Sequence, residues 1–155
     1  MLDLNEDFAD LLLEFSKAAV EYVVVGAHAL AVAGVPRATG DLDVLVRPTA
    51  ENAARVYAAL RAFGAPLAVA DVKQSDFTLL DCVYQMGLPP RRVDVMTSIS
   101  GVTFEEAHAS RVTVERNGIP IPLLGRDMLI QNKRAAARPK DLADVDALEH
   151  LPRHP

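Results

Sequence analysis

The sequence predicts an α/β (α+β) fold in which a mixed β-sheet is flanked by helices. Three observations support this fold class. Apolar residues recur at helical spacing in the N-terminal segment 4–15. Short apolar, β-branched runs at 22–26, 37–46 and 92–97 have the length and composition of strands. The Asn-Gly pair at 117–118, between two further apolar runs, is a strong hairpin signal.

The chain of 155 residues is long enough to bury a hydrophobic core without a disulfide or a structural metal. Its hydrophobic content of 50% and charged content of 24% are ordinary for a soluble globular protein. No repeat, low-complexity tract or linker divides it. We therefore predict one domain over residues 1–155, with residues 126–151 forming a C-terminal helical pair packed on it.

The N-terminal half is predicted to alternate helix and strand. The apolar stripe of the first helix consists of Leu4, Phe8, Leu11, Leu12 and Phe15. Strand 22–26 leads into helix 27–33. A further helix follows the 37–46 strand, with Thr49 as its N-cap and Gly64 as its stop.

The C-terminal half is predicted to contain more strands and a closing pair of helices. Residues 77–84 form a strand before the 92–97 strand, and Thr103 starts a short helix through a capping box. The hairpin has strands 112–115 and 119–123, and its two prolines, Pro120 and Pro122, confine the second strand to a sheet edge. Helices 127–137 and 140–150 follow, the last with a buried stripe of Leu142, Val145 and Leu148.

Composition excludes several classes of protein. A net charge of −5 argues against an obligate nucleic-acid coat protein, although a local basic patch stays open. The single cysteine, Cys82, excludes a disulfide framework and a thiolate metal cluster, and it favours a reducing compartment. No apolar run reaches the ~18 residues that span a bilayer, and the start of the chain is unlike a signal peptide. We expect a cytoplasmic protein without a membrane partner.

The most informative motif is the Asp-Leu-Asp-Val run that begins at Asp41. On a strand, Asp41 and Asp43 share one face while Leu42 and Val44 bury the other. Two such carboxylates about 7 Å apart repel by roughly 2 kcal/mol at an effective dielectric near 20. A cation between them removes that repulsion, and hard oxygen ligands favour Mg²⁺ or Mn²⁺.

A third acid, Asp94, lies on the strand 92–97 between apolar residues. If this strand lies beside the Asp41–Asp43 strand, three carboxylates converge on one spot. That is the ligand set of a divalent-metal phosphoryl-transfer site. Taken alone, Asp94 is equally well a solvated acid on an edge strand.

Strand 22–26 ends in Gly26 and runs into a helix whose first residue is Ala27. Backbone N–H groups and the positive end of the helix dipole at such a corner can bind a phosphate. Glycine also simply ends many strands, so the signal gains weight from the acids that follow it. His28, just beyond, is expected to be structural.

Basic residues gather before the last helix, in an otherwise acidic chain. Lys133, Arg138 and Lys140 are candidates for contacting a triphosphate, against the alternative of a solvated helix face. Arg37, four residues before the first acid, either leans over the same cleft or belongs to a turn. Asp141 and Asp144 are expected to be structural acids near the start of the last helix.

The sequence resembles the nucleotidyltransferase fold of the DNA polymerase β superfamily in the order of three motifs, which are Val25-Gly26-Ala27, the acid pair Asp41 and Asp43, and Val93-Asp94-Val95. The phrases GAHALAVAGVPRATGDLDVLV and LIQNKRAAARPKDLADVDAL are similar to small bacterial nucleotidyltransferase-like toxins of abortive-infection and toxin–antitoxin systems. The resemblance covers roughly residues 20–150. It implies Mg²⁺, an NTP, a lysine such as Lys133 on the triphosphate and, as partner, a cognate antitoxin. Ala27 stands where the family pattern has Gly or Ser, so phosphate binding there rests on backbone N–H groups.

The function predicted from these residues is metal-dependent transfer of an NMP from an NTP to an acceptor hydroxyl, with release of pyrophosphate. Asp41, Asp43 and Asp94 hold the metal and are the catalytic residues. The acceptor is a tRNA, a protein or a small molecule. The alternative is an inactive nucleotidyltransferase-like module that acts by binding protein or RNA. A dinucleotide-binding oxidoreductase is disfavoured because no Gly-x-Gly-x-x-Gly follows strand 22–26.

Overall fold

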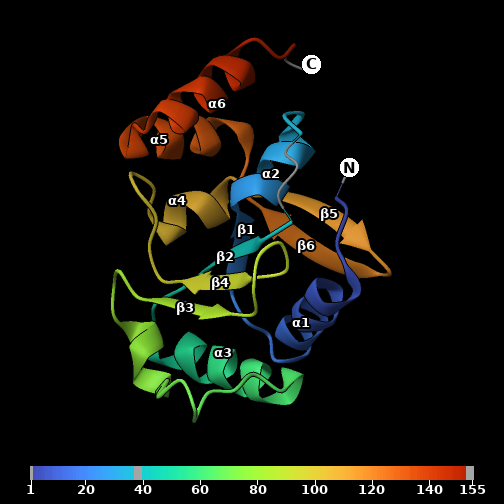
Figure 1. The fold of residues 1–155 in the computed structure, drawn as a ribbon, viewed down its shortest axis with the longest axis vertical. Coiled ribbons are helices and arrows are strands. Elements are labelled where there is room, and N and C mark those ends of the chain that lie inside the picture. The colour runs from blue at the N-terminus through green and yellow to red at the C-terminus, as the bar shows by residue number, and fades with distance from the viewer. Residues whose placement is uncertain (1, 37–39, 153–155) are drawn as a thin grey trace.

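The computed structural model describes residues 2–36 and 40–152, which form one mixed six-stranded sheet with helices on its two sides (Figure 1). The strand order is β3-β4-β2-β1-β6-β5. The strands are β1 (Tyr22–Val25), β2 (Leu42–Val46), β3 (Val83–Met86), β4 (Val93–Met96), β5 (Val112–Arg116) and β6 (Ile119–Leu123). β2 runs parallel to β4, β1 parallel to β6, and the other neighbours are antiparallel. The predicted fold class is thus confirmed.

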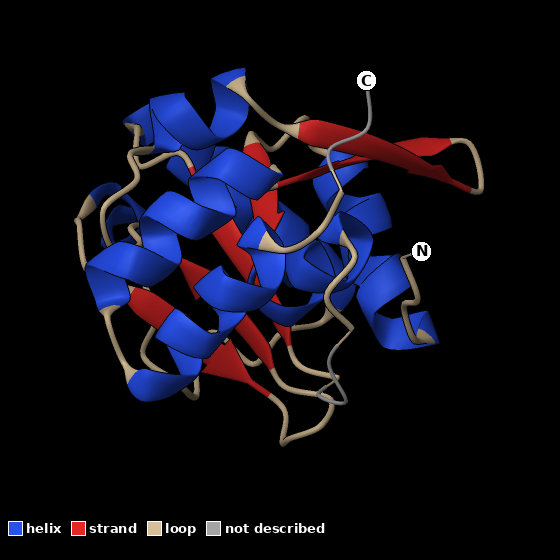
Figure 2. Ribbon diagram, turned by 90° about the horizontal axis from the view of Figure 1, so that it is seen from above, coloured by secondary structure: helices blue, strands red, loops and turns tan. Residues whose placement is uncertain are grey.

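The helices form layers around this sheet. They are α1 (Glu6–Lys17), α2 (Gly26–Ala33), α3 (Ala50–Phe63), α4 (Phe104–Ala109), α5 (Arg126–Ala136) and α6 (Pro139–Glu149), with a 3₁₀ helix, η1 (Gln74–Thr78). In Figure 1, α1 and α3 lie below the sheet, and α2, α5 and α6 lie above it. Figure 2 shows these upper helices in front of the strands. None of the helices in the described ranges is long and apolar enough to cross a membrane.

Local signals account for the lower layer. The predicted stripe of α1 is buried, and the helix starts where the Asn5 side chain accepts the Phe8 N–H at 2.9 Å. Thr49 caps the start of α3, and Gly64, with a φ of +97°, caps its end, as predicted. Buried Asn52 then ties α3 to the strands through Glu21 and the carbonyl of Arg47. The layer that supports the sheet is therefore specified by short-range patterns.

The strand predicted over residues 77–84 is wrong in its first half. Residues Gln74–Thr78 form η1, and the strand begins only at Val83. The Asp76 carboxylate accepts the Lys73 N–H at 2.9 Å, a local bond that favours a tight turn over an extended chain. Phe77 is buried from this turn, so its apolar character reflects an anchor of η1.

The Asn-Gly hairpin is confirmed, with φ values of +52° and +79° at Asn117 and Gly118. The edge position predicted for its second strand is wrong, because β6 lies between β1 and β5. β1 and β6 pair only at Val24 and Leu123, and the next residue along β6 donates to Val24 O. Alternate residues direct their N–H to the same side. The N–H groups that Pro120 and Pro122 lack would therefore point toward β1, with which β6 shares only the Val24–Leu123 pair.

Candidate functional site

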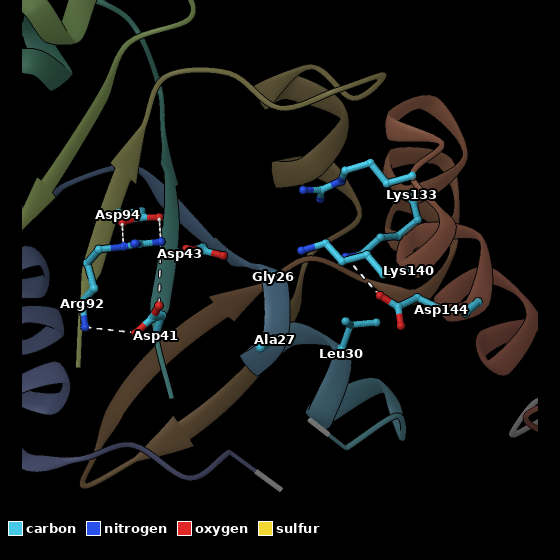
Figure 3. Close-up of a pocket in the computed structure, with 12 residues that line it drawn as sticks. Gly26, Ala27, Leu30, Asp41, Asp43, Arg92, Asp94, Lys133, Lys140 and Asp144 are labelled. Atoms are coloured by element: carbon cyan, nitrogen blue, oxygen red, sulfur yellow. Dashed lines mark hydrogen bonds and ion pairs between the residues drawn. The ribbon is translucent and has the colours of Figure 1, made fainter. Parts of the chain in front are cut away.

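The three predicted acids lie at one end of the central strands. β2 and β4 pair in parallel, with Asp43 directly opposite Asp94, and Asp41 precedes β2 by one residue. All three line a cavity of about 640 Å³ (Figure 3). Because neighbouring strands are about 4.8 Å apart and registered residues point to the same face, the pairing brings the carboxylates together. The spatial convergence expected from the sequence is thus present.

Gly26 lines the same cavity beside these acids. β1 ends opposite Asp43, and α2 starts at Gly26 with a φ of +69°, a region that residues with a Cβ rarely adopt. A Cβ at this position would collide with the Asp43 carboxylate. Two independent constraints therefore require glycine here, and the first turn of α2 lies against the acids. Ala27 and Leu30 of α2 also line the cavity.

Burial and the neighbouring acids shift the pKa of Asp43. Burial is the largest cause that raises the pKa of Asp43, to about 7 from 3.8. The charge of Asp94, a hydrogen bond with its side chain and the charge of Asp41 raise this pKa further, and Arg92 opposes the shift. Without a bound cation, the Asp43 carboxyl therefore keeps its proton to a higher pH than an ordinary carboxyl does. A bound cation would remove that proton.

Arg92 is a site residue that the sequence reasoning missed. Its Nε donates to Asp94 Oδ1 at 2.8 Å and its Nη2 to Asp94 Oδ2 at 3.2 Å. Nη2 also lies 3.8 Å from Asp41 Oδ2, and the Arg92 backbone N–H donates to Asp41 Oδ1 at 3.1 Å. The signal was available, because a residue two positions before Asp94 on a strand shares its face.

The Arg92 guanidinium bears on whether the three carboxylates can act as metal ligands in this structure. Within the described ranges, no three Asp, Glu, His or Cys side chains are arranged as a ready metal-ligand cluster. That the three acids hold a metal therefore stays a prediction, and in this structure Arg92 contacts both oxygens of Asp94. The donor chemistry still fits Mg²⁺ or Mn²⁺, since the oxygens are hard and Arg92 offsets only part of the rise in the pKa of Asp43.

The three predicted basic residues line the opposite wall of the cavity. Lys133 comes from α5, Arg138 caps α6, and Lys140 lies in its first turn. In Figure 3 the labelled Lys133 and Lys140 face the acids across the cavity. The site thus has an acidic wall from the sheet and a basic wall from the C-terminal helices.

Buried acids hold this basic wall in place. Lys133 Nζ lies 3.3 Å from Asp141 Oδ1 and 3.2 Å from Asp144 Oδ2. Arg138 Nε donates to Asp141 Oδ2 at 2.6 Å, and hydrogen bonds from Arg138 and then Lys133 lower the pKa of Asp141. The structural role expected for Asp141 and Asp144 agrees with these contacts, while Asp144 also lines the cavity.

The buried stripe predicted for the last helix is partly wrong. Leu142 is 50% exposed, and the buried positions of α6 are Asp141, Asp144, Val145 and Leu148. Two acids occupy the stripe because Lys133 and Arg138 neutralise them there. A pattern based on apolar residues alone cannot detect this arrangement.

Two further predicted positions are Arg37 and His28. Arg37 falls outside the described residues. His28 is buried, with its Nε2 3.3 Å from the Gly40 carbonyl oxygen and its ring edge-on to Phe8. These contacts agree with a structural histidine.

No family model and no curated protein matches this sequence. Among solved structures, the chain is similar to a protein from Thermotoga maritima named "putative nucleotidyltransferase". The two share 15% sequence identity with a TM-score of 0.56, over 95% of this chain and 93% of that one. At this identity the likeness concerns the fold. The chain therefore has a nucleotidyltransferase fold.

Proposed function

We propose that this protein is a Mg²⁺-dependent nucleotidyltransferase, which moves an NMP from an NTP to an acceptor hydroxyl and releases pyrophosphate. One observation carries the proposal. The acids of β2 and β4 face the cations of α5 and α6 across a single cavity at the Gly26 corner. A triphosphate needs both walls, because its own negative charge must be offset at each end.

Asp41, Asp43 and Asp94 are the residues that would hold the metal. A divalent ion there would neutralise phosphate charge and the charge that develops on the leaving oxygen. The acid wall by itself repels a triphosphate, so NTP binding is expected to depend on the ion. The fit requires Asp94 to give up its contacts with Arg92.

The chain's own residues supply positioning and charge. The N–H groups at Gly26 and Ala27 orient the phosphates at the start of α2. Lys133, Arg138 and Lys140 offset the charge of the departing pyrophosphate. The acceptor oxygen attacks the α-phosphorus, the bond from this phosphorus to the pyrophosphate oxygen breaks, and the Asp94 carboxylate takes the hydroxyl proton.

The acceptor we propose is a tRNA, a protein side chain or a small molecule, each of which offers a hydroxyl. The resemblance to toxin-like nucleotidyltransferases adds a cognate antitoxin as a proposed partner. A second function is favoured by two observations, the pairing of Arg92 with Asp94 and the missing hydroxyl at Ala27. It is a nucleotidyltransferase-like module that binds a protein or RNA without catalysis.

The two functions are separated by labelling with α-³²P-labelled NTPs, each tested with tRNA and with cell protein as acceptors. We expect Mg²⁺-dependent labelling by the wild type, and a loss of about 100-fold or more in Asp43→Asn. Asp146→Asn, an exposed acid of the same protein on α6, is the matched control and should label normally. Labelling that survives in Asp43→Asn or in EDTA contradicts the proposal. A wild type that neither labels nor binds NTP with Mg²⁺ in calorimetry favours the binding module.

A further inference from the structure

Arg92 has no part in the transfer proposed above, although it contacts two of the three acids. We infer that the Arg92 guanidinium is the resident counter-ion of the acid cluster, and that a divalent ion binds only when this side chain releases Asp94. The inference rests on the proposed function in one respect, that the acids hold a metal. Arg92 would then set the metal affinity of the site and stabilise its metal-free state.

The contacts of Arg92 are made to the carboxylate oxygens that a divalent ion would also need. Arg92 takes Asp94 Oδ1 at 2.8 Å and Oδ2 at 3.2 Å, so the planar guanidinium engages both oxygens of the carboxylate. Its Nη2 also lies 3.8 Å from Asp41 Oδ2, which places its charge between acids of the two strands. A divalent ion requires oxygens of the same carboxylates. Each of the two cations therefore weakens the binding of the other.

The side chain can move without the backbone. Strand pairing fixes the Arg92 main chain, because its carbonyl accepts the Leu42 N–H at 2.9 Å and its N–H donates to Asp41. The side chain itself is 32% exposed, so it can rotate toward solvent without crossing the core. Asp41 keeps its backbone contact when the guanidinium leaves. Release is therefore a change of rotamer at one residue.

The apparent affinity for an ion falls by the fraction of molecules in which the site is open. If Arg92 is released in about one molecule in ten, its removal raises metal affinity about tenfold. The metal-free protein without the guanidinium, in contrast, loses the cation that pairs with Asp94 and should unfold at a lower temperature. A residue that only positioned Asp94 for the ion would have the opposite effect on affinity.

The test is calorimetric titration of the full chain with Mn²⁺, together with thermal unfolding in EDTA. We expect Arg92→Gln to bind Mn²⁺ about tenfold more tightly than the wild type and to unfold at a lower temperature without metal. Arg91→Gln, the exposed neighbour, is the matched control and should change neither quantity. The gain in affinity should disappear in Arg92→Gln combined with Asp43→Asn, which shows that the ion binds at the acids.

Equal or weaker Mn²⁺ binding by Arg92→Gln overturns the inference, and so does an unchanged unfolding temperature. If Arg92→Gln does not fold, Arg92→Lys serves instead, because a lysine cannot make the paired contact with Asp94. The Arg92→Lys variant should then bind Mn²⁺ more tightly than the wild type does. Nucleotide transfer is scored separately. If Arg92→Gln binds Mn²⁺ more tightly but neither the wild type nor any variant transfers a nucleotide, the proposed function alone is overturned. If the wild type transfers a nucleotide but Arg92→Gln binds Mn²⁺ no more tightly than it does, the role of Arg92 alone is overturned.

Discussion

Gly26 and Asp43 are the residues at which fold and chemistry constrain each other most directly. The corner between β1 and α2 is packed so closely on Asp43 that a Cβ at position 26 would collide with the Asp43 carboxylate. The same packing removes water from Asp43 and contributes to its raised pKa. The glycine thus brings backbone N–H groups close to the acids, and it does so at a cost to the stability of the ionised carboxylate.

Gly26→Ala is expected to destabilise the protein by about 2 kcal/mol or more, because it adds a collision with Asp43 to the cost of a positive φ. Gly118→Ala is the matched control. Its φ is +79°, and a Cβ there has nothing within 4 Å, so it carries the backbone cost alone. Urea unfolding of both variants measures the difference. Equal losses in the two variants would show that the contact with Asp43 is unimportant.

Asp43 also predicts how stability depends on pH in the metal-free protein. Its folded pKa of about 7 exceeds the ordinary value of 3.8, so the folded state holds this proton more tightly than the unfolded state. Its contribution to stability is therefore present below about pH 4 and is lost as pH rises through 7.

We accordingly expect Asp43→Asn to be more stable than the wild type at pH 8 in EDTA, by about 1 kcal/mol, with a smaller difference at pH 5. Thermal unfolding at the two pH values provides the measurement. Asp146→Asn should show no such pH-dependent gain, since this carboxylate is exposed on α6. An Asp43→Asn variant that is less stable than the wild type at pH 8 would contradict the raised pKa.

At the scale of elements, α5 and α6 are joined by charge as well as by apolar packing. Lys133 of α5 lies between two carboxylates of α6 that are almost fully buried, Asp141 and Asp144. Such a pair is costly to break from one side, because the remaining charge stays buried without its partner. The lysine expected on the triphosphate thus also fixes the helix pair that presents the basic wall.

Lys133→Met should cost about 3 kcal/mol of unfolding free energy, since it leaves two buried acids with one cation fewer. The control lies one residue further along α5. Arg134 pairs with Glu149 at an exposed position, and Arg134→Met should cost about 0.5 kcal/mol or less. Urea denaturation compares the two. A similar small loss in both variants would mean that α5 and α6 are held by apolar contacts alone.

At the scale of the whole molecule, the fold brings three segments that are distant in the sequence together around one cavity. The net charge of −5 conceals the arrangement, in which acids from the sheet face cations from the C-terminal helices. The acidic segments and the basic segment are brought together by the strand order and by the packing of α5 and α6 above the sheet. The proposed binding of a metal and a triphosphate is a property of this assembly, and no single segment supplies it.

Most of the fold could be read from short-range patterns. The caps of α3 and α4, the stripe of α1 and the Asn-Gly turn involve neighbours within about four residues, and their physics is local. The acids Asp41, Asp43 and Asp94 could be chosen because a strand directs alternate residues to one face. Their roles as ligands, and those of the basic residues, remain predictions.

Other features depend on partners that lie far away in the chain. The bond between Arg92 and Asp41 spans 51 positions, the interior place of β6 follows from its pairing with β1, and the burial of Asp141 depends on Lys133 of another helix. Local propensity does not encode which distant charge neutralises an acid or which strand becomes a neighbour. The primary structure therefore specified the elements and the chemical character of the site, whereas three-dimensional packing selected the counter-ions, because burial and Coulomb energy depend on distances between segments.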